Sequence, residues 1–267
     1  MPQLGLALGS QISGGKLTIY DTDALTYINA VQAADGQSLE NGVKVAINDF
    51  VVGCKADGIW TAIKASCIMA GARTLSGALV PLAGTAPTNN NFVSADYNRK
   101  TGLIGNGTSK NLNANRNNTD DPQDDKHISA YCTTGNTRDA TRQLVATAIA
   151  SNTGACILFT STTAFSARIS YGLPPTGITV SGLINGLQGG SRNNSLSVDA
   201  YFNNSSTSVA NVSSAQISSD TFVFSNPAST FFSDARVSFY SIGTSINLAL
   251  LDTRITTLMN TLASVIP

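Results

Sequence analysis

The sequence has 267 residues, a formal net charge of zero and 12% charged residues, about half of the usual ~25%. Because nucleic acids are bound through clusters of Lys and Arg, and the sequence has none, we expect no nucleic-acid partner. Residues 1–9 lack the basic start of a signal peptide, and no apolar run approaches the ~20 residues of a membrane span. We therefore expect neither a secretion signal nor insertion into a membrane.

Residues 1–20 are predicted to form an extended N-terminal arm. Leu alternates with Gly and Ala in the first part, and the turn residues 13–15 precede a second apolar run at 16–20. Such an arm either completes the sheet of a neighbouring subunit or closes the chain's own sandwich. The sequence leaves both alternatives open.

Residues 21–87 are predicted to form a helical attachment or packing region with a linker. Asp21 can cap a first helix, which Gly36 ends. Apolar residues on one side predict a second helix from Ser38 to about residue 56, and a third helix is expected at 59–68. The only tryptophan, in this third segment, is expected to anchor the helical core. Pro81 and Pro87 prevent the apolar linker from being a continuous helix.

Residues 88–243 are predicted to form a β-sandwich that begins with a hairpin. A strand at 102–105 would turn at Asn106-Gly107, where a tight turn needs positive φ values, and return at 110–112. Further strands are expected at 127–133, 144–150, 156–161, 166–171, 178–184, 195–202, 221–224 and 236–242. Gly189-Gly190 is assigned to a turn between strands. Residues 244–267 are predicted to form a C-terminal helix, which either packs on its own domain, the favoured interpretation, or forms a coiled-coil seam.

The residue inventory argues against most enzyme classes. His127 is the only histidine and is expected in an Asp-rich loop, so a Ser–His–Asp or Cys–His apparatus has one candidate base. Glycoside hydrolysis needs two carboxylates beside the scissile bond, and the only glutamate, Glu40, lies in the helical region. The cysteines form no Cys-x-x-Cys unit and are expected to be buried free thiols, as in a reducing cytoplasm. We expect no enzyme and no cofactor.

Two groups of residues are candidate binding sites. An Asp-rich loop could hold Ca²⁺ through hard oxygen ligands, although a solvated acidic turn is the favoured interpretation; its aspartates are Asp120, Asp121, Asp124 and Asp125. Tyr rings and amides in sandwich loops could bind carbohydrate, although packing of Tyr on a strand is the alternative for each residue taken singly. The carbohydrate candidates are Tyr97, Asn98, Tyr171 and Tyr201.

Several runs of the sequence resemble proteins encoded by tailed bacteriophages and prophages. The runs are 35–40 (DGQSLE), 50–60 (FVVGCKADGIW), 71–82 (GARTLSGALVPL), 96–103 (DYNRKTGL), 239–243 (FYSIG) and 250–254 (LLDTR). In those proteins the first three runs precede a region that looks like a concanavalin A-like (laminin G-like) jelly roll. Residues 130–230 match in style only. These motifs are structural rather than catalytic.

The resemblance implies a virion structural protein of the tail fibre or baseplate whose jelly roll contacts host-surface polysaccharide. It would be assembled in the bacterial cytoplasm, contact other virion proteins and form a homo-oligomer. Two alternatives stay open. The first is a capsid decoration or structural subunit without receptor binding, and the second, less favoured, is a glycan depolymerase.

Overall fold

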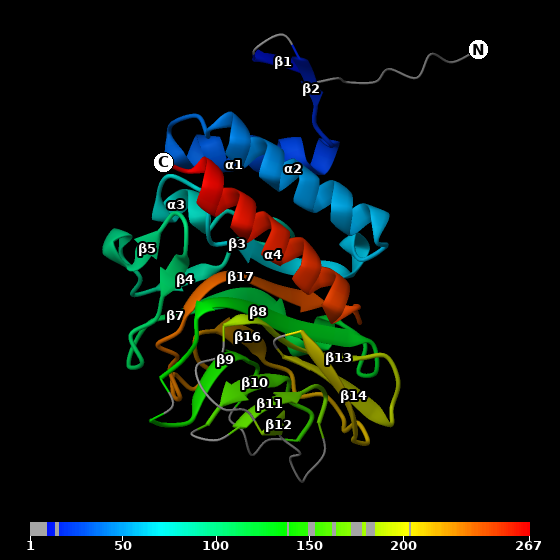
Figure 1. The fold of residues 1–267 in the computed structure, drawn as a ribbon. Helices are drawn as coiled ribbons and strands as arrows, with labels where there is room; N and C mark the ends of the chain where they lie inside the picture. Colours follow the sequence, from blue (N-terminus) through cyan, green and yellow to red (C-terminus); the bar gives the residue numbers. More distant parts are fainter. Residues whose placement is uncertain are drawn as a thin grey trace, which may run out of the picture.

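Two antiparallel sheets and a layer of helices make up the fold (Figure 1). The computed structural model describes residues 10–13, 16–137, 139–148, 153–161, 164–171, 178–179, 185–202 and 204–267. One sheet faces the second sheet on one side and the helices on the other, so the two hydrophobic cores lie on its opposite faces. The predicted fold class, an antiparallel β-sandwich with N-terminal helices and a C-terminal helix, is confirmed.

The sheet between the two cores has eight strands in the order β15-β14-β13-β8-β17-β6-β5, with β3 also paired to β17. Its strands are β3 (Ile63–Ile68), β5 (Tyr97–Asn98), β6 (Gly102–Ile104), β8 (Lys126–Thr134), β13 (Gly186–Arg192), β14 (Ser197–Phe202), β15 (Ser205–Ala210) and β17 (Arg236–Gly243). On the long central strand β8, Ile128, Ala130 and Cys132 face the other sheet, whereas Tyr131 faces the helices, as does Phe239 of the neighbouring strand β17. This alternation follows the two-residue period of a strand.

The second sheet has seven strands in the order β12-β11-β10-β9-β16-β7-β4. Its strands are β4 (Thr88–Asn90), β7 (Asn111–Asn117), β9 (Arg142–Ala146), β10 (Ile157–Thr160), β11 (Ala164–Arg168), β12 (Ile178–Thr179) and β16 (Asp220–Val223). Leu112, Leu144 and Phe165 from this sheet meet Ile128 and Tyr240 from the first sheet in the sandwich core. All five are almost completely buried.

The helical layer combines segments from both ends of the chain. Its helices are α1 (Thr22–Asp35), α2 (Asn41–Ala56), the one-turn α3 (Leu75–Ala78) and α4 (Leu248–Val265). The predicted caps of α1 are confirmed, since Asp21 accepts a hydrogen bond from the Asp23 N–H and Gly36 has a φ of 65°. α4 packs against α2 and β13, which agrees with the favoured interpretation of the C-terminal helix. Within the described residues, no helix has the length and apolarity needed to span a membrane.

The third predicted helix, at 59–68, is wrong. Trp60–Ala62 form a single 3-10 turn, and Ile63–Ile68 form β3, which pairs with β17 in the sheet. Five of its six residues are buried, because β3 lies between the helical core and the sandwich core. A fully buried strand has no alternating pattern, so its apolar run can be mistaken for a helix. Trp60 is half-buried beside α1, where its indole N–H donates to Asp23.

The predicted hairpin around Asn106-Gly107 is also wrong. The strand at 102–104 is β6 of the eight-stranded sheet, whereas the return segment begins β7 of the seven-stranded sheet. The connection therefore crosses from one sheet to the other. The Asn106 side-chain oxygen accepts hydrogen bonds from the N–H groups of Thr108, Ser109 and Lys110. Gly107 adopts a φ of 71°, so a positive φ was correctly expected here.

Most predicted strands are confirmed at or near their expected positions, as β8, β10, β11, β14, β16 and β17. The segment 144–150 is strand only as far as Ala146, and residues 149–150 lie outside the described residues, as do 180–184 of the segment 178–184. β13 and β15 were not expected. Gly189 and Gly190 lie inside β13 rather than in a turn. Glycine fits here because a Cβ at position 190 would come within 2.9 Å of the Ala167 side chain.

The N-terminal arm forms a hairpin of its own. β1 (Ser10–Ser13) pairs with β2 (Lys16–Ile19) in a separate two-stranded sheet. Figure 1 shows this hairpin standing off the helical layer. These strands belong to neither sandwich sheet, so in this structure they do not close the chain's own sandwich.

Candidate functional site

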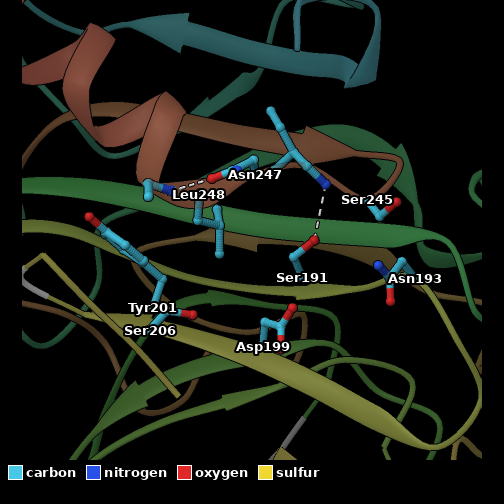
Figure 2. Close-up of a pocket in the computed structure, with 10 residues that line it drawn as sticks. Ser191, Asn193, Asp199, Tyr201, Ser206, Ser245, Asn247 and Leu248 are labelled. Atoms are coloured by element: carbon cyan, nitrogen blue, oxygen red, sulfur yellow. Dashed lines mark hydrogen bonds between the residues drawn. The ribbon is translucent and has the colours of Figure 1, made fainter. Parts of the chain in front are cut away.

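A polar pocket of about 490 Å³ lies against β13, β14 and β15, beside the N-terminus of α4 (Figure 2). It is lined by Ser191, Asn193, Asp199, Tyr201, Ser206, Ser245, Ile246, Asn247, Leu248 and Ala249. The volume falls in the range of small-molecule sites, ~300–1,000 Å³. Hydroxyl, amide and carboxylate groups predominate among the lining side chains.

The β14–β15 hairpin supplies one wall of the pocket. Asp199 and Tyr201 are two residues apart on β14 and therefore point to the same face of the sheet. The strand pairing places Ser206 of β15 opposite Tyr201. All three side chains lie on the face that carries the helices, because Tyr201 belongs to the core beneath α4.

The segment before α4 supplies the other wall and is held by two hydrogen bonds from its backbone. The Ile246 N–H donates to the Ser191 hydroxyl at 3.0 Å, and the Ser245 N–H donates to Asp125 Oδ1 at 2.8 Å. The Asn247 side chain caps the helix by accepting hydrogen bonds from the backbone N–H groups of Ala249 and Leu250. These hydrogen bonds hold the backbone of this wall in place without a ligand.

Asp199 and Asn193 offer hydrogen-bonding groups to the pocket. Both side chains are exposed, and Asp199 forms no ion pair with any described residue. The Asn193 side-chain oxygen accepts from Asn194, which leaves the Asn193 amide N–H groups for a ligand. Leu248 adds an apolar surface. This combination fits a neutral molecule that carries several hydroxyl groups.

Tyr201 is the only carbohydrate candidate from the sequence that lies in this pocket. Its side chain is buried, and its hydroxyl donates to Asp252 Oδ2 of α4 at 2.8 Å. Burial and the neighbouring carboxylate raise the pKa of the Tyr201 hydroxyl. The ring therefore fixes α4 against β14 and forms part of the wall, rather than offering a face for stacking.

The structure does not bring the other three carbohydrate candidates to this site. The Tyr97 hydroxyl donates to the Ala72 carbonyl at 2.7 Å, and burial raises its pKa. The Asn98 side chain is exposed but accepts from two N–H groups of its own turn. Tyr171 is buried, with the Arg168 guanidinium 5.0 Å from its ring. For Tyr97 and Tyr171 the alternative, packing within the fold, is the observed role.

The four aspartates of the predicted calcium loop have separate roles. Arg116 binds Asp121, which is buried, in a two-bond ion pair at 2.5 and 2.9 Å. Asp120 accepts from the Asn117 N–H, Asp125 holds the Ser245 backbone, and one Asp124 oxygen is buried. Among the described residues, no group of three or more His, Cys, Asp or Glu side chains is placed to hold a metal. The solvated-turn interpretation also fails for Asp121.

His127 lies in the interior of β8 rather than in an exposed loop. Its Nδ1 is 2.5 Å from the Thr244 carbonyl oxygen, which can only accept, so Nδ1 carries the proton. Nε2 then accepts from the Ser241 hydroxyl at 2.6 Å. Burial lowers the pKa of His127 to about 4. The residue is a neutral structural link between β8, β17 and the start of α4, and the four cysteines are buried free thiols as expected.

Comparisons with known proteins find distant structural likeness only. No protein-family model matches the chain, and no curated protein matches it. The binding domain of botulinum neurotoxin serotype D aligns with a TM-score of 0.48 at 12% identity, over 73% of this chain and 51% of that one. A sialidase from Trypanosoma rangeli, in complex with 2,3-difluorosialic acid, aligns with a TM-score of 0.46 at 11% identity, over 75% of this chain and 33% of that one.

A third likeness is to botulinum neurotoxin type C, whose cell entry depends on interaction with two ganglioside molecules. Its TM-score is 0.38 at 12% identity, over 60% of this chain and 42% of that one. The chain thus spans from 33% to 51% of the length of these three structures. Because identities and TM-scores are this low, the likenesses assign neither a family nor a ligand to the chain.

The pocket residues Asn193 and Asp199 were not predicted from the sequence. A usable signal was present for Asp199, because it alternates with Tyr201 on a strand that was predicted correctly. The other wall forms because α4 packs on β13, which brings Ser245 and Ile246 against Ser191, about fifty positions earlier in the chain. No local pattern encodes that contact.

Proposed function

We propose that the protein is a non-enzymatic, glycan-binding structural protein of a bacteriophage virion, carried on the tail fibre or baseplate. The observation that carries the binding part is the polar pocket between β14 and the start of α4, with its free Asp199 carboxylate and Asn193 amide. The virion part is supported by the sequence runs that resemble phage proteins, with other virion proteins as the implied partners. If the resemblance to phage proteins holds, the β-sandwich of this chain is a concanavalin A-like jelly roll.

The pocket's chemistry suits a sugar. A pyranose offers vicinal hydroxyl groups, which pair with a carboxylate that accepts two hydrogen bonds and with an amide that donates. Leu248 gives an apolar contact for the ring C–H groups. Among the described lining residues Asp199 is the one charged group, and none of them is a cation that could pair with an anionic sugar, so a neutral glycan is the expected ligand.

The proposal of a non-enzymatic role is supported by the pocket's carboxylates. Both retaining and inverting glycosidases use two carboxyl groups, ~5–9.5 Å apart, whereas the lining residues include Asp199 alone. The buried carboxylate of Asp252, behind Tyr201, accepts a hydrogen bond from the Tyr201 hydroxyl and has a structural role. A depolymerase is therefore the less favoured alternative.

Binding of the purified protein to an array of bacterial surface glycans tests the proposal. We expect neutral polysaccharides to bind, and Asp199→Asn to weaken that binding about tenfold or more, as for loss of a charge-assisted hydrogen bond. The matched control is Tyr97→Phe, which removes a hydroxyl far from the pocket and should leave binding unchanged. Binding that is absent, or equal in Asp199→Asn, would refute the assignment of the pocket.

Two further measurements separate the alternatives. Release of reducing ends from a bound polysaccharide would identify a depolymerase, and we expect none. Immunogold labelling of the particle should place the protein on the tail. Labelling of the head without glycan binding would instead identify a capsid decoration subunit.

A further inference from the structure

The outer edge of the eight-stranded sheet is unusually open. Among the described residues, β15 is the last strand on its side and pairs with β14 alone. It has six residues, five of them exposed, whereas the outermost strands β4, β5 and β12 have two or three residues each. The strand sequence, SSTSVA, contains no charged residue and no proline. Natural sheets usually protect such an edge with Lys, Pro, a bulge or a covering segment.

The N-terminal hairpin has the opposite deficiency. Within the part of the chain that the structure describes, β1 and β2 pair with each other alone, in a sheet of eight residues. An isolated two-stranded hairpin is at best marginally stable in water, and a third strand is what stabilises it. Among the described strands, none therefore pairs with the free edges of the hairpin or with the outer edge of β15.

The hairpin cannot reach β15 of its own chain. Asp21, two residues after β2, is fixed to the body because its N–H donates to Asn48 and its carboxylate pairs with Lys55. The chain from Lys16 to this anchor spans at most about 17 Å. The start of α1 contacts Trp60, directly before β3, and β3 lies five strand spacings from β15, about 24 Å across the sheet.

We propose that the β1–β2 hairpin of a second copy of this chain adds to the β15 edge, so that subunits exchange N-terminal arms. The hairpin extends the eight-stranded sheet of its neighbour and covers the edge. Each subunit donates one hairpin and receives one, and the exchange closes into a symmetric homo-oligomer. Backbone hydrogen bonds provide this contact, so the uncharged sequence of β15 suits it.

The outward backbone groups of β15 can be assigned. The Asn211 N–H, which follows β15, donates inward to the Leu196 carbonyl, and the Ser213 N–H donates inward to the Ser195 carbonyl. Alternation along an antiparallel ladder then directs the N–H groups of the even-numbered residues of β15 outward. Ser208→Pro therefore removes an outward donor and leaves the pairing with β14 in place, whereas Thr207→Pro removes an inward donor.

The experiment measures molar mass by light scattering for three proteins. They are the full-length chain, the edge variant Ser208→Pro and an arm variant with Ile12→Pro and Leu17→Pro, which are partners across the hairpin. The unmodified chain should have a molar mass of two or more times 27.6 kDa, in whole multiples, and each variant measured by itself should be a monomer. An equimolar mixture of the two variants should form a dimer, because one supplies the hairpin and the other the edge.

Every other pattern overturns the proposal. A monomeric full-length chain shows that no exchange occurs. If only the edge variant fails to assemble, β15 pairs with β15 of another copy. If only the arm variant fails to assemble, the arms contact each other. A monomeric mixture would also refute the exchange.

Two controls keep the outcome independent of misfolding. Circular-dichroism melting should be unchanged in Ser208→Pro and shifted down in Thr207→Pro. Should Ser208→Pro fail to fold, Ser206→Lys with Ser208→Lys charges the same edge as natural sheets do. Amide exchange at residues 206, 208 and 210 should be slow in the full-length chain and at least tenfold faster in the arm variant.

Discussion

The stability of the protein should fall as the pH drops below 6.5, through the single histidine. His127 is completely buried in β8, and burial lowers its pKa from 6.5 to about 4. The unfolded chain takes up a proton as the pH falls through 6.5, whereas the folded chain stays neutral until about pH 4. The contribution is therefore fully present above pH 6.5 and is lost progressively between pH 6.5 and pH 4.

The expected size follows from the difference between the two pKa values. At pH 5 the free energy of unfolding should be about 2 kcal/mol lower than at pH 8, approaching about 3 kcal/mol at pH 4. Urea unfolding at pH 8, 7, 6 and 5 measures it. Between pH 8 and pH 5 the change in stability should come mainly from His127, because carboxylates with lowered pKa values, such as those of Asp21 and Glu40, take up protons at lower pH.

The control is His127→Asn, which lacks a titrating group at this position. It should be less stable than the natural chain at every pH, because the bonds to Thr244 and Ser241 are altered, but its stability should not change between pH 8 and pH 5. The one histidine also gives one Hε1 NMR signal, which should not titrate above pH 5. A flat stability curve for the natural chain, or an unchanged slope in His127→Asn, would refute the reasoning.

Three further substitutions probe the contacts that hold the fold. Tyr201→Phe leaves an oxygen of buried Asp252 unpaired and should lower stability by about 1.5–3 kcal/mol, or roughly 3–12 °C in melting temperature by calorimetry. Gly102→Ala should cost about 1–3 kcal/mol in urea unfolding, because Gly102 has a φ of 97° and a Cβ would clash with the Val237 carbonyl; an unchanged midpoint would contradict this. Arg99→Lys loses the two-bond pair with Glu40 and should cost about 1–2 kcal/mol, with a double-mutant cycle to Glu40→Gln as the check.

Three of the six sequence runs that resemble phage proteins supply contacts that hold the helical layer to the sheet. Asp35, at the end of α1, accepts from the N–H groups of Arg73 and Thr74 and from the Thr74 hydroxyl. Glu40 binds Arg99 in two hydrogen bonds and also pairs with Arg73. These residues come from three separate runs, so the resemblance follows a structural junction rather than a binding site.

The sequence predicted local structure well where a local rule applies. The caps of α1 and the long strands β8 and β17 follow from residue type and alternation. The prediction from sequence failed where contacts between residues distant in the chain determine the secondary structure. Five of the six residues of β3 are buried, so the strand lacks alternation. Gly189-Gly190 lies inside a strand, at a place where α4 and β11 approach too closely for larger residues. β15 was missed because a Ser-rich strand has no apolar face, and among the described strands it pairs with β14 alone.

The pocket and the β15 edge belong to the same β14–β15 hairpin. The two proposals can still be separated, because they predict different losses of glycan binding for a pocket variant and an edge variant. Ser206 lines the pocket and belongs to the edge strand, which puts a bound hairpin of the second copy next to the pocket wall. An oligomer would then present several pockets, and attachment to a glycan-coated surface would gain from avidity. Asp199→Asn should weaken binding to a soluble oligosaccharide and to a coated surface alike. Ser208→Pro should weaken only the surface binding, because each pocket is intact and only its multiplicity is lost. Equal losses in the two formats for Ser208→Pro would show instead that the arm completes the pocket itself.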